Sequence, residues 1–208
     1  MERLLLVRHG ESPWNRTGRV SGWAPIGLTD RGREQATRVG RHIAARYDVD
    51  RLYASDLRRA TLTARAIADC LGTAHDDIRP EPGWRERDFG VYQGLTDEEV
   101  AEADPDLAAR YRRGEVPESE RPPSGESTAE FRDRVLQGWR ALTDDPAGTV
   151  VLVTRTAPIV VLLSTVRGIG PQDGFDDHAP ANCSLTEVTW DGTAREATVV
   201  RENETGVL

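Results

Sequence analysis

The sequence predicts an α/β fold, a three-layer α/β/α sandwich built around a mostly parallel central sheet. Short, continuous apolar runs at 4–7 and 149–153 are typical of strands that are buried on both faces. Between them lie longer segments whose apolar residues recur at helical spacing, and strands that alternate with helices form a layered domain. At roughly 150 residues per domain, the 208 residues favour a single domain over 1–208, with an excursion or lid around 96–126.

The first apolar run ends abruptly at the polar segment 8–12. We expect this segment at the carboxyl edge of the sheet, where open α/β sheets bind their ligands. Thr29 is suited to cap an amphipathic helix, and residues 51–54 have the composition of a short second strand. Residues 55–56 are expected to cap the next helix, which places Arg58 in its first turn at another strand-to-helix junction.

The second half of the chain continues the alternation. Capping-box patterns at 96–99 and 127–130 predict two further helices, the first of which ends near Arg113. The polar, proline-rich segment 115–125 has no core pattern and is expected to form part of the excursion. The remaining elements predicted are a helix over 158–166 and strands over 184–190 and 197–201.

The chain is acidic, because 27 arginines and no lysine stand against 35 acidic residues and leave a net charge of −8. This charge argues against nucleic-acid and anionic-membrane partners, which are usually bound by a basic face. Neither a membrane-spanning run nor a signal-peptide core is present, so we expect a cytoplasmic protein. The two cysteines, Cys70 and Cys183, cannot build a disulfide framework or a multi-cysteine zinc site, which fits a reducing compartment.

Polar residues at three strand ends suggest an anion site. Arg8, Arg58 and Arg155 each follow a predicted strand, and arginine forks bind phosphate or carboxylate oxygens bidentately. His9, beside the first of them, could serve there as a general base or as a nucleophile. No set of residues at metal-ligand spacing and no P-loop or dinucleotide fingerprint is present, so we expect neither metal nor cofactor.

Four ordered motifs resemble those of a known family. The run at 8–15, with the motif at 21–32, resembles the N-terminal signature of the histidine phosphatase superfamily, in its phosphoglycerate mutase-like branch. Residues 55–64, 84–96 and 125–127 are similar to the second, third and fourth motifs of that family. The resemblance covers essentially the whole chain in the family's order, and it implies a phosphoglycerate mutase-like fold.

The resemblance also implies roles for individual residues. His9 would accept the phosphoryl group, and Glu86 would give a proton to the leaving alkoxide and later take one from the attacking water. Arginines would hold the phosphoryl oxygens, with an asparagine as a neutral donor. The expected site consists of the catalytic residues His9 and Glu86, the phosphate ligands Arg8, Asn15, Arg58 and Arg155, and the substrate-contacting residues Ser21 and Gly22, without a metal.

The last family motif departs from the pattern. After a strand such as 150–153 the family normally has Ser/Thr-His-Gly-Gly, whereas this chain has Thr-Arg-Thr-Ala, with Arg155 at the position of the second catalytic histidine. Arginine there can still donate to phosphate, but it cannot exchange a proton near neutral pH. Three readings stay open: Arg155 binds phosphate in a working enzyme, Arg155 weakens or abolishes activity, or its side chain points elsewhere.

The leading hypothesis is a metal-independent phosphatase that hydrolyses small phosphomonoesters through a phosphohistidine intermediate. The motifs at 84–90 and 125–127 look more like the phosphatase branch, while the basic pair at 112–113 leaves mutase-type phosphoryl transfer as an alternative. A catalytically impaired homologue that only binds phospholigands is the second alternative. We expect a small phosphorylated substrate as partner, no nucleic acid and no membrane, and a homodimer stays open as an assembly.

Overall fold

The computed structural model describes residues 2–145, 148–170, 179–191 and 196–206. In these residues one six-stranded sheet has the order β3-β2-β4-β1-β5-β6. The first four of these strands run parallel, and β5 and β6 complete the sheet in antiparallel pairing. The strands are β1 (Glu2–Arg8), β2 (Arg51–Ala54), β3 (Arg79–Pro80), β4 (Thr149–Thr154), β5 (Leu185–Asp191) and β6 (Glu196–Glu204).

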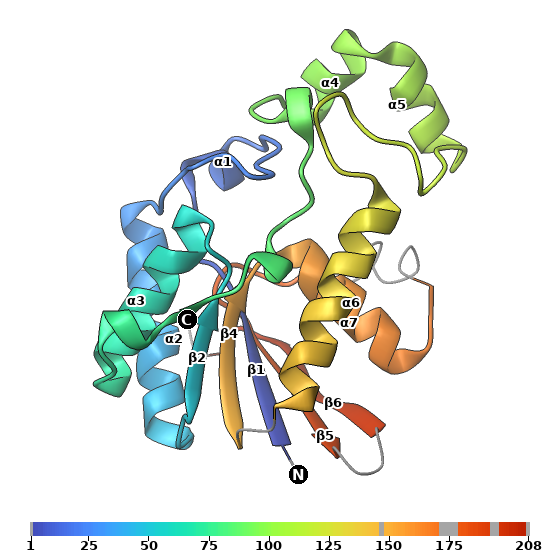
Figure 1. Ribbon diagram of the computed structural model, residues 1–208. Coiled ribbons are helices and arrows are strands. Elements are labelled where there is room, and N and C mark those ends of the chain that lie inside the picture. The colour runs from blue at the N-terminus through green and yellow to red at the C-terminus, as the bar shows by residue number, and fades with distance from the viewer. Residues whose placement is uncertain (1, 146–147, 171–178, 192–195, 207–208) are drawn as a thin grey trace.

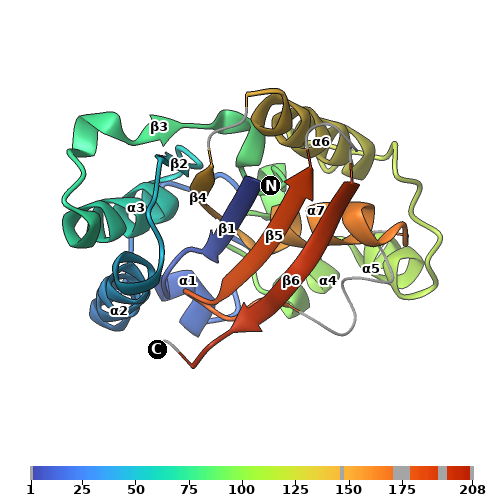
Figure 2. The ribbon, with the colours of Figure 1, turned by 90° about the horizontal axis from the view of Figure 1, so that it is seen from below.

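Helices cover both faces of the sheet (Figures 1 and 2). One core cluster joins the sheet to α2 and α3, and the other joins it to α6 and α7. The α-helices described are α1 (Pro13–Arg16), α2 (Asp30–Arg46), α3 (Arg58–Leu71), α4 (Asp97–Ala103), α5 (Pro105–Arg112), α6 (Thr128–Asp144) and α7 (Thr156–Arg167), with short 3₁₀ helices η1 (His75–Asp77), η2 (Pro82–Trp84) and η3 (Gly90–Tyr92). The predicted three-layer α/β fold is confirmed.

The central strand β1 shows why its apolar run is continuous. Leu4 and Leu6 belong to the core cluster on the α6 and α7 side, while Leu5 and Val7 belong to the cluster on the α2 and α3 side. All four side chains are fully buried. Because both faces of β1 are covered by helices, alternation of apolar and polar residues is absent from this strand.

Most of the predicted helix starts are confirmed, and one is wrong. Thr29 caps α2, and both capping boxes form, at the starts of α4 and α6. The expected cap of α3 at 55–56 is wrong, because Leu57 is its N-terminal cap residue and makes no side-chain cap bond. Asp56 instead pairs with Arg85 from the loop after η2, so this carboxylate fastens that loop to the start of α3.

The excursion contains two helices where one was predicted. Asp104 ends α4 and also caps α5, and Pro105 follows it as the first residue of α5. A proline at this position cannot donate the hydrogen bond that would continue α4, so the chain turns. In Figure 1, α4 and α5 stand apart from the helical layers, beyond the carboxyl ends of β1 and β4.

No helix in the described part of the chain is both long and apolar enough to cross a membrane.

Candidate active site

The site is organised around the end of β1. His9 follows the last residue of β1, and its backbone N–H donates to the carbonyl oxygen of Thr154, the last residue of β4, at 2.9 Å. Thr154 in turn donates its hydroxyl to the carbonyl oxygen of Trp84 at 2.6 Å. These bonds bring the ends of two central strands and the segment before Glu86 to one place, as expected for the carboxyl edge of an open sheet.

The loop after His9 passes close to the start of α2. A Cβ on Gly10 would lie 2.3 Å from the carbonyl oxygen of Gly32, so no larger residue fits there without a backbone shift. The N–H of Gly10 donates to the hydroxyl of Thr63, on α3, at 3.0 Å. The glycine therefore lets the strand end pack tightly against two helices and holds His9 in one position.

The His9 imidazole is buried and oriented. Its Nδ1 lies 2.7 Å from the carbonyl oxygen of Gly10 and acts as the donor, because a carbonyl can only accept. Nε2 then carries the free electron pair, and it is buried without a hydrogen-bond partner among the described residues. Burial is the main cause that holds the pKa of His9 well below its usual range, and nearby arginine charges add to the effect. The ring is therefore neutral at neutral pH.

Three arginines supply the positive charge at His9. Arg59, Arg155 and Arg8 all lower the pKa of the imidazole. Arg59 is fully buried on α3 and donates from Nη2 to the carbonyl oxygen of Gly22 at 2.7 Å. Burial and the charge of Arg155 lower the pKa of Arg59 to about 9 and that of Arg8 to about 10, so both stay protonated at neutral pH. Each of the three guanidinium groups has a buried Nε without a partner in the described structure.

One expected site residue lies outside this cluster. Arg58 is exposed on α3 and is not among the charges that act on His9, whereas its neighbour Arg59 is buried and acts on it. Successive residues of an α-helix point about 100° apart, so only one of two adjacent arginines can face the core. Arg59 is four residues before Thr63, which is also buried, so the helical spacing of the buried face was the signal that could have identified it.

Glu86 and Arg155 lie in direct contact. Glu86 is almost fully buried, and its Oε2 is 3.3 Å from Nη1 of Arg155, at the start of α7. Its other oxygen accepts a hydrogen bond from the backbone N–H of Arg87 at 2.8 Å. Arg155 therefore points into the same cluster as His9 and Arg8 and does not turn away from it.

The other expected site residues have local partners. The side-chain oxygen of Asn15 accepts from the N–H of Ser12 at 3.0 Å, which closes the first turn of α1. Asn182, which the sequence reasoning missed, donates to the carbonyl oxygen of His9 at 2.9 Å and lies 3.4 Å from the same oxygen of Asn15. Ser21 is buried and donates to a backbone carbonyl, and Gly22 contributes the carbonyl that binds Arg59.

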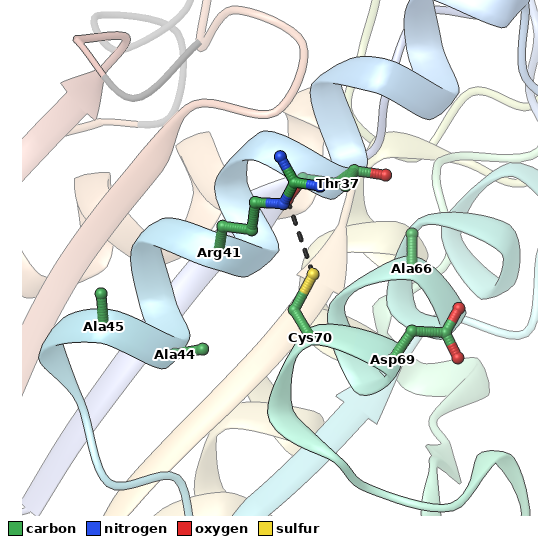
Figure 3. Close-up of a pocket in the computed structure, with 7 residues that line it drawn as sticks. All are labelled: Thr37, Arg41, Ala44, Ala45, Ala66, Asp69 and Cys70. Atoms are coloured by element: carbon green, nitrogen blue, oxygen red, sulfur yellow. Dashed lines mark hydrogen bonds between the residues drawn. The ribbon is translucent and has the colours of Figure 1, made fainter.

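The described structure offers no metal site, and its groove between α2 and α3 lies away from the His9 cluster. The described residues contain no group of three or more histidine, cysteine, aspartate or glutamate side chains that could hold a metal ion. An open groove of about 690 Å³ lies between α2 and α3, where Cys70 donates to the carbonyl oxygen of Thr37 at 3.6 Å (Figure 3). None of the expected site residues lines this groove.

Comparisons with known proteins show which family the chain is similar to. A family model described as "Histidine phosphatase superfamily (branch 1)" matches residues 4–204. The chain is 33% identical over 208 residues to "Bifunctional protein Rv2228c" of Mycobacterium tuberculosis, covering 99% of this chain but 55% of that protein. It is 34% identical over 198 residues to "Probable phosphoglycerate mutase GpmB" of Enterobacter sp., covering 91% of this chain and 86% of the other.

The fold is also found in solved structures. Bacillus stearothermophilus YhfR superposes with a TM-score of 0.86 at 24% identity, over 100% of this chain and 99% of that one. At this identity the likeness concerns the fold, whereas the family match extends over nearly every described element. The chain belongs to the histidine phosphatase superfamily, branch 1.

Proposed function

We propose that this chain is a metal-independent phosphatase that hydrolyses small phosphomonoesters through a phosphohistidine at His9. The observation that carries the proposal is the state of the imidazole: it is neutral, its Nδ1 is held by Gly10, and its buried Nε2 has no protein partner in the described structure. A nitrogen nucleophile needs this free electron pair. The surrounding guanidinium groups provide fixed positive charge for a phosphoryl group.

In the first step, Nε2 of His9 attacks phosphorus and the bond between phosphorus and the ester oxygen breaks. Arg8, Arg59 and Arg155 stabilise the charge on the three phosphoryl oxygens. The leaving alkoxide takes a proton from the Glu86 carboxyl group, so a neutral alcohol departs. In the second step, water attacks phosphorus while the Glu86 carboxylate accepts its proton. The bond between phosphorus and nitrogen breaks, inorganic phosphate leaves, and His9 returns to its neutral form.

Arg155 has two competing partners in this scheme. In the structure its Nη1 lies 3.3 Å from Oε2 of Glu86. A phosphoryl group at His9 carries more negative charge than one carboxylate and offers several acceptor oxygens, so it competes for the same guanidinium. The proposal requires Arg155 to turn to the phosphoryl group and the freed Glu86 carboxylate to take up the proton of a phosphomonoester monoanion, which it then gives to the leaving oxygen.

The test is covalent labelling combined with turnover. Incubation with a radiolabelled phosphoryl donor should label the wild-type chain, and His9→Ala should abolish both the label and the release of phosphate. His75→Ala is the matched control, because His75 is an exposed histidine paired with Asp69 and should leave both signals unchanged. Turnover that persists in His9→Ala would refute the mechanism.

Specific observations also favour two alternatives. The contact between Arg155 and Glu86 favours a homologue that binds phospholigands without hydrolysing them. This alternative predicts binding of inorganic phosphate without turnover of any ester. A relative named as a phosphoglycerate mutase favours phosphoryl transfer instead. Mutase activity would appear as movement of phosphate between the carbons of phosphoglycerate without release of free phosphate.

A further inference from the structure

The segment that carries Glu86 has no regular structure of its own. Residues 85–89 lie between the 3₁₀ helices η2 and η3, so no helix or strand fixes the backbone of Glu86. A carboxyl group that transfers a proton must lie within hydrogen-bond reach of the reacting oxygen. Other parts of the chain must therefore hold this backbone in place.

Arg134, on α6, supplies much of that support. Its Nη1 donates to the carbonyl oxygens of Gly83 at 2.9 Å and Arg85 at 3.1 Å. Its Nη2 donates to the carbonyl oxygen of Glu86 at 3.2 Å. A guanidinium group has five N–H donors in a rigid fork, so one side chain can bind several carbonyl groups at once. Arg134 thus ties the backbone from Gly83 to Glu86 to the core helix α6.

Glu126 holds the guanidinium of Arg134 in turn. Nε of Arg134 donates to Oε1 at 2.9 Å and Nη2 donates to Oε2 at 2.7 Å, which is a bidentate pair. The two side chains are 22% and 14% exposed, so solvent screens this pair less than a surface ion pair. The carbonyl oxygen of Glu126 also accepts from Nε of Arg87 at 2.9 Å, so it contacts the residue next to Glu86 directly.

Trp23 provides a second donor to the same carbonyl group. Its Nε1 donates to the carbonyl oxygen of Glu86 at 2.7 Å. The centre of its ring is 4.5 Å from the guanidinium carbon of Arg85 and 5.9 Å from that of Arg134. The Glu86 carbonyl oxygen is therefore bound from two separate segments of the chain, one of which is the Arg134 fork.

We propose that Arg134, oriented by Glu126, is a positioning residue that aims the Glu86 carboxyl group at the leaving-group oxygen. This inference rests on the proposed function, because Glu86 has a proton to deliver only if the chain cleaves phosphomonoesters. A misplacement of about 1 Å can cost about 10²-fold in rate. The proton matters most for a basic alkoxide and little for a nitrophenolate, which leaves without one. The contribution of Arg134 therefore depends on the leaving group.

The experiment compares wild type and Arg134→Gln on two esters, glycerol phosphate and 2,4-dinitrophenyl phosphate. We expect kcat/KM to fall about 30-fold for the alkyl ester and less than about threefold for the aryl ester. Arg132→Gln is the matched control, because it removes a guanidinium from the same helix, one that pairs with Glu118 and not with the Glu86 segment. Glu126→Gln, which keeps a hydrogen-bonding side chain, is a second variant with the same expected pattern if Arg134→Gln folds poorly.

Glu86→Gln separates the positioning role from the proposed function itself. If Glu86 is the acid, this variant alone loses activity selectively on the alkyl ester, and adding Arg134→Gln lowers it little further. Equal losses on both esters in Arg134→Gln, or no loss, would overturn the role of Arg134 and leave the function intact. If wild type turns over neither ester, or if Glu86→Gln shows no leaving-group dependence, the proposed function fails and the positioning role fails with it.

Discussion

Arginines gather around a buried polar group at two places on the sheet, and the two places differ in how that group is satisfied. On β5, the carboxylate of Glu187 is bound by Arg3 at 2.7 Å, by the hydroxyl of Tyr47 at 3.1 Å and, at 3.6 Å, by Arg201. At the end of β1, the Nε2 of His9 has no partner among the described residues, and three neighbouring guanidinium groups each keep an unpartnered buried Nε.

We propose that the difference separates an ion cluster that stabilises the fold from one that binds a ligand. A buried polar atom without a partner costs free energy, so it persists where something other than stability maintains it. In the Glu187 cluster both carboxylate oxygens have partners. In the His9 cluster the Nε donors of three arginines and the electron pair on Nε2 of His9 have none among the described residues. Substitutions in the first should therefore change stability, and those in the second should change activity.

We expect the largest change in activity from a substitution at Arg59, in the His9 cluster. Arg59→Met should lower kcat/KM for phosphomonoesters about 10³-fold, since loss of one preorganised donor to a developing charge costs about 10²–10³-fold. Arg58→Met, its exposed neighbour, should stay close to wild type. Steady-state kinetics of both variants on one ester compare the two losses of kcat/KM, and circular dichroism checks that both variants are folded. A greater loss in Arg58→Met would mean that the exposed arginine is the phosphate ligand.

The next effect concerns Arg155. Arg155→Gln should weaken competitive inhibition by inorganic phosphate about tenfold or more, because a charged donor is removed from the anion site. Arg155→His should also lower kcat/KM if the arginine has become a working phosphate ligand. A large gain in Arg155→His would show instead that the contact with Glu86 impairs the enzyme.

Some parts of the site can be predicted from the sequence alone. The end of β1 could be predicted because its continuous apolar run stops after Val7, and strands buried on both faces are typically continuous apolar runs. The choice between Arg58 and Arg59 needed only the helical period, since Arg59 shares the buried face of α3 with Ala60 and Thr63. The sequence therefore contains the signal that distinguishes the two arginines.

Other parts of the site could not be predicted from local patterns. Arg155 contacts Glu86 because the end of β4 and an irregular loop meet in three dimensions, and no periodicity describes such a loop. The same holds for Asn182, whose amide binds the carbonyl of His9 from the turn before β5. Contacts between segments distant in sequence follow from the sheet order, which the sequence pattern does not specify.

A smaller effect, on stability alone, is expected at Glu187. Glu187→Gln should lower the free energy of unfolding by about 2 kcal/mol, because a buried carboxylate with charged donors is replaced by an amide that also donates. Its partners Arg3 and Arg201 are 40% and 51% exposed, which keeps the effect below that of a fully buried pair. Urea denaturation measures the loss, and kcat/KM should not change. A large loss of activity in Glu187→Gln at unchanged stability would contradict the assignment of the Glu187 cluster to stability alone.

The smallest effect is a pH dependence of stability that originates at His9. Burial first, and then the charges of Arg59, Arg155 and Arg8, hold the pKa of folded His9 well below its ordinary value of 6.5. Below pH 6.5 the unfolded chain therefore binds a proton that the folded chain does not, so stability falls as pH decreases and is independent of this group above that value. The slope from one such group reaches at most about 1.4 kcal/mol per pH unit. Urea denaturation of wild type and His9→Gln between pH 7 and pH 5 should show a steeper loss in wild type, and parallel curves would mean that the imidazole is protonated in the folded chain.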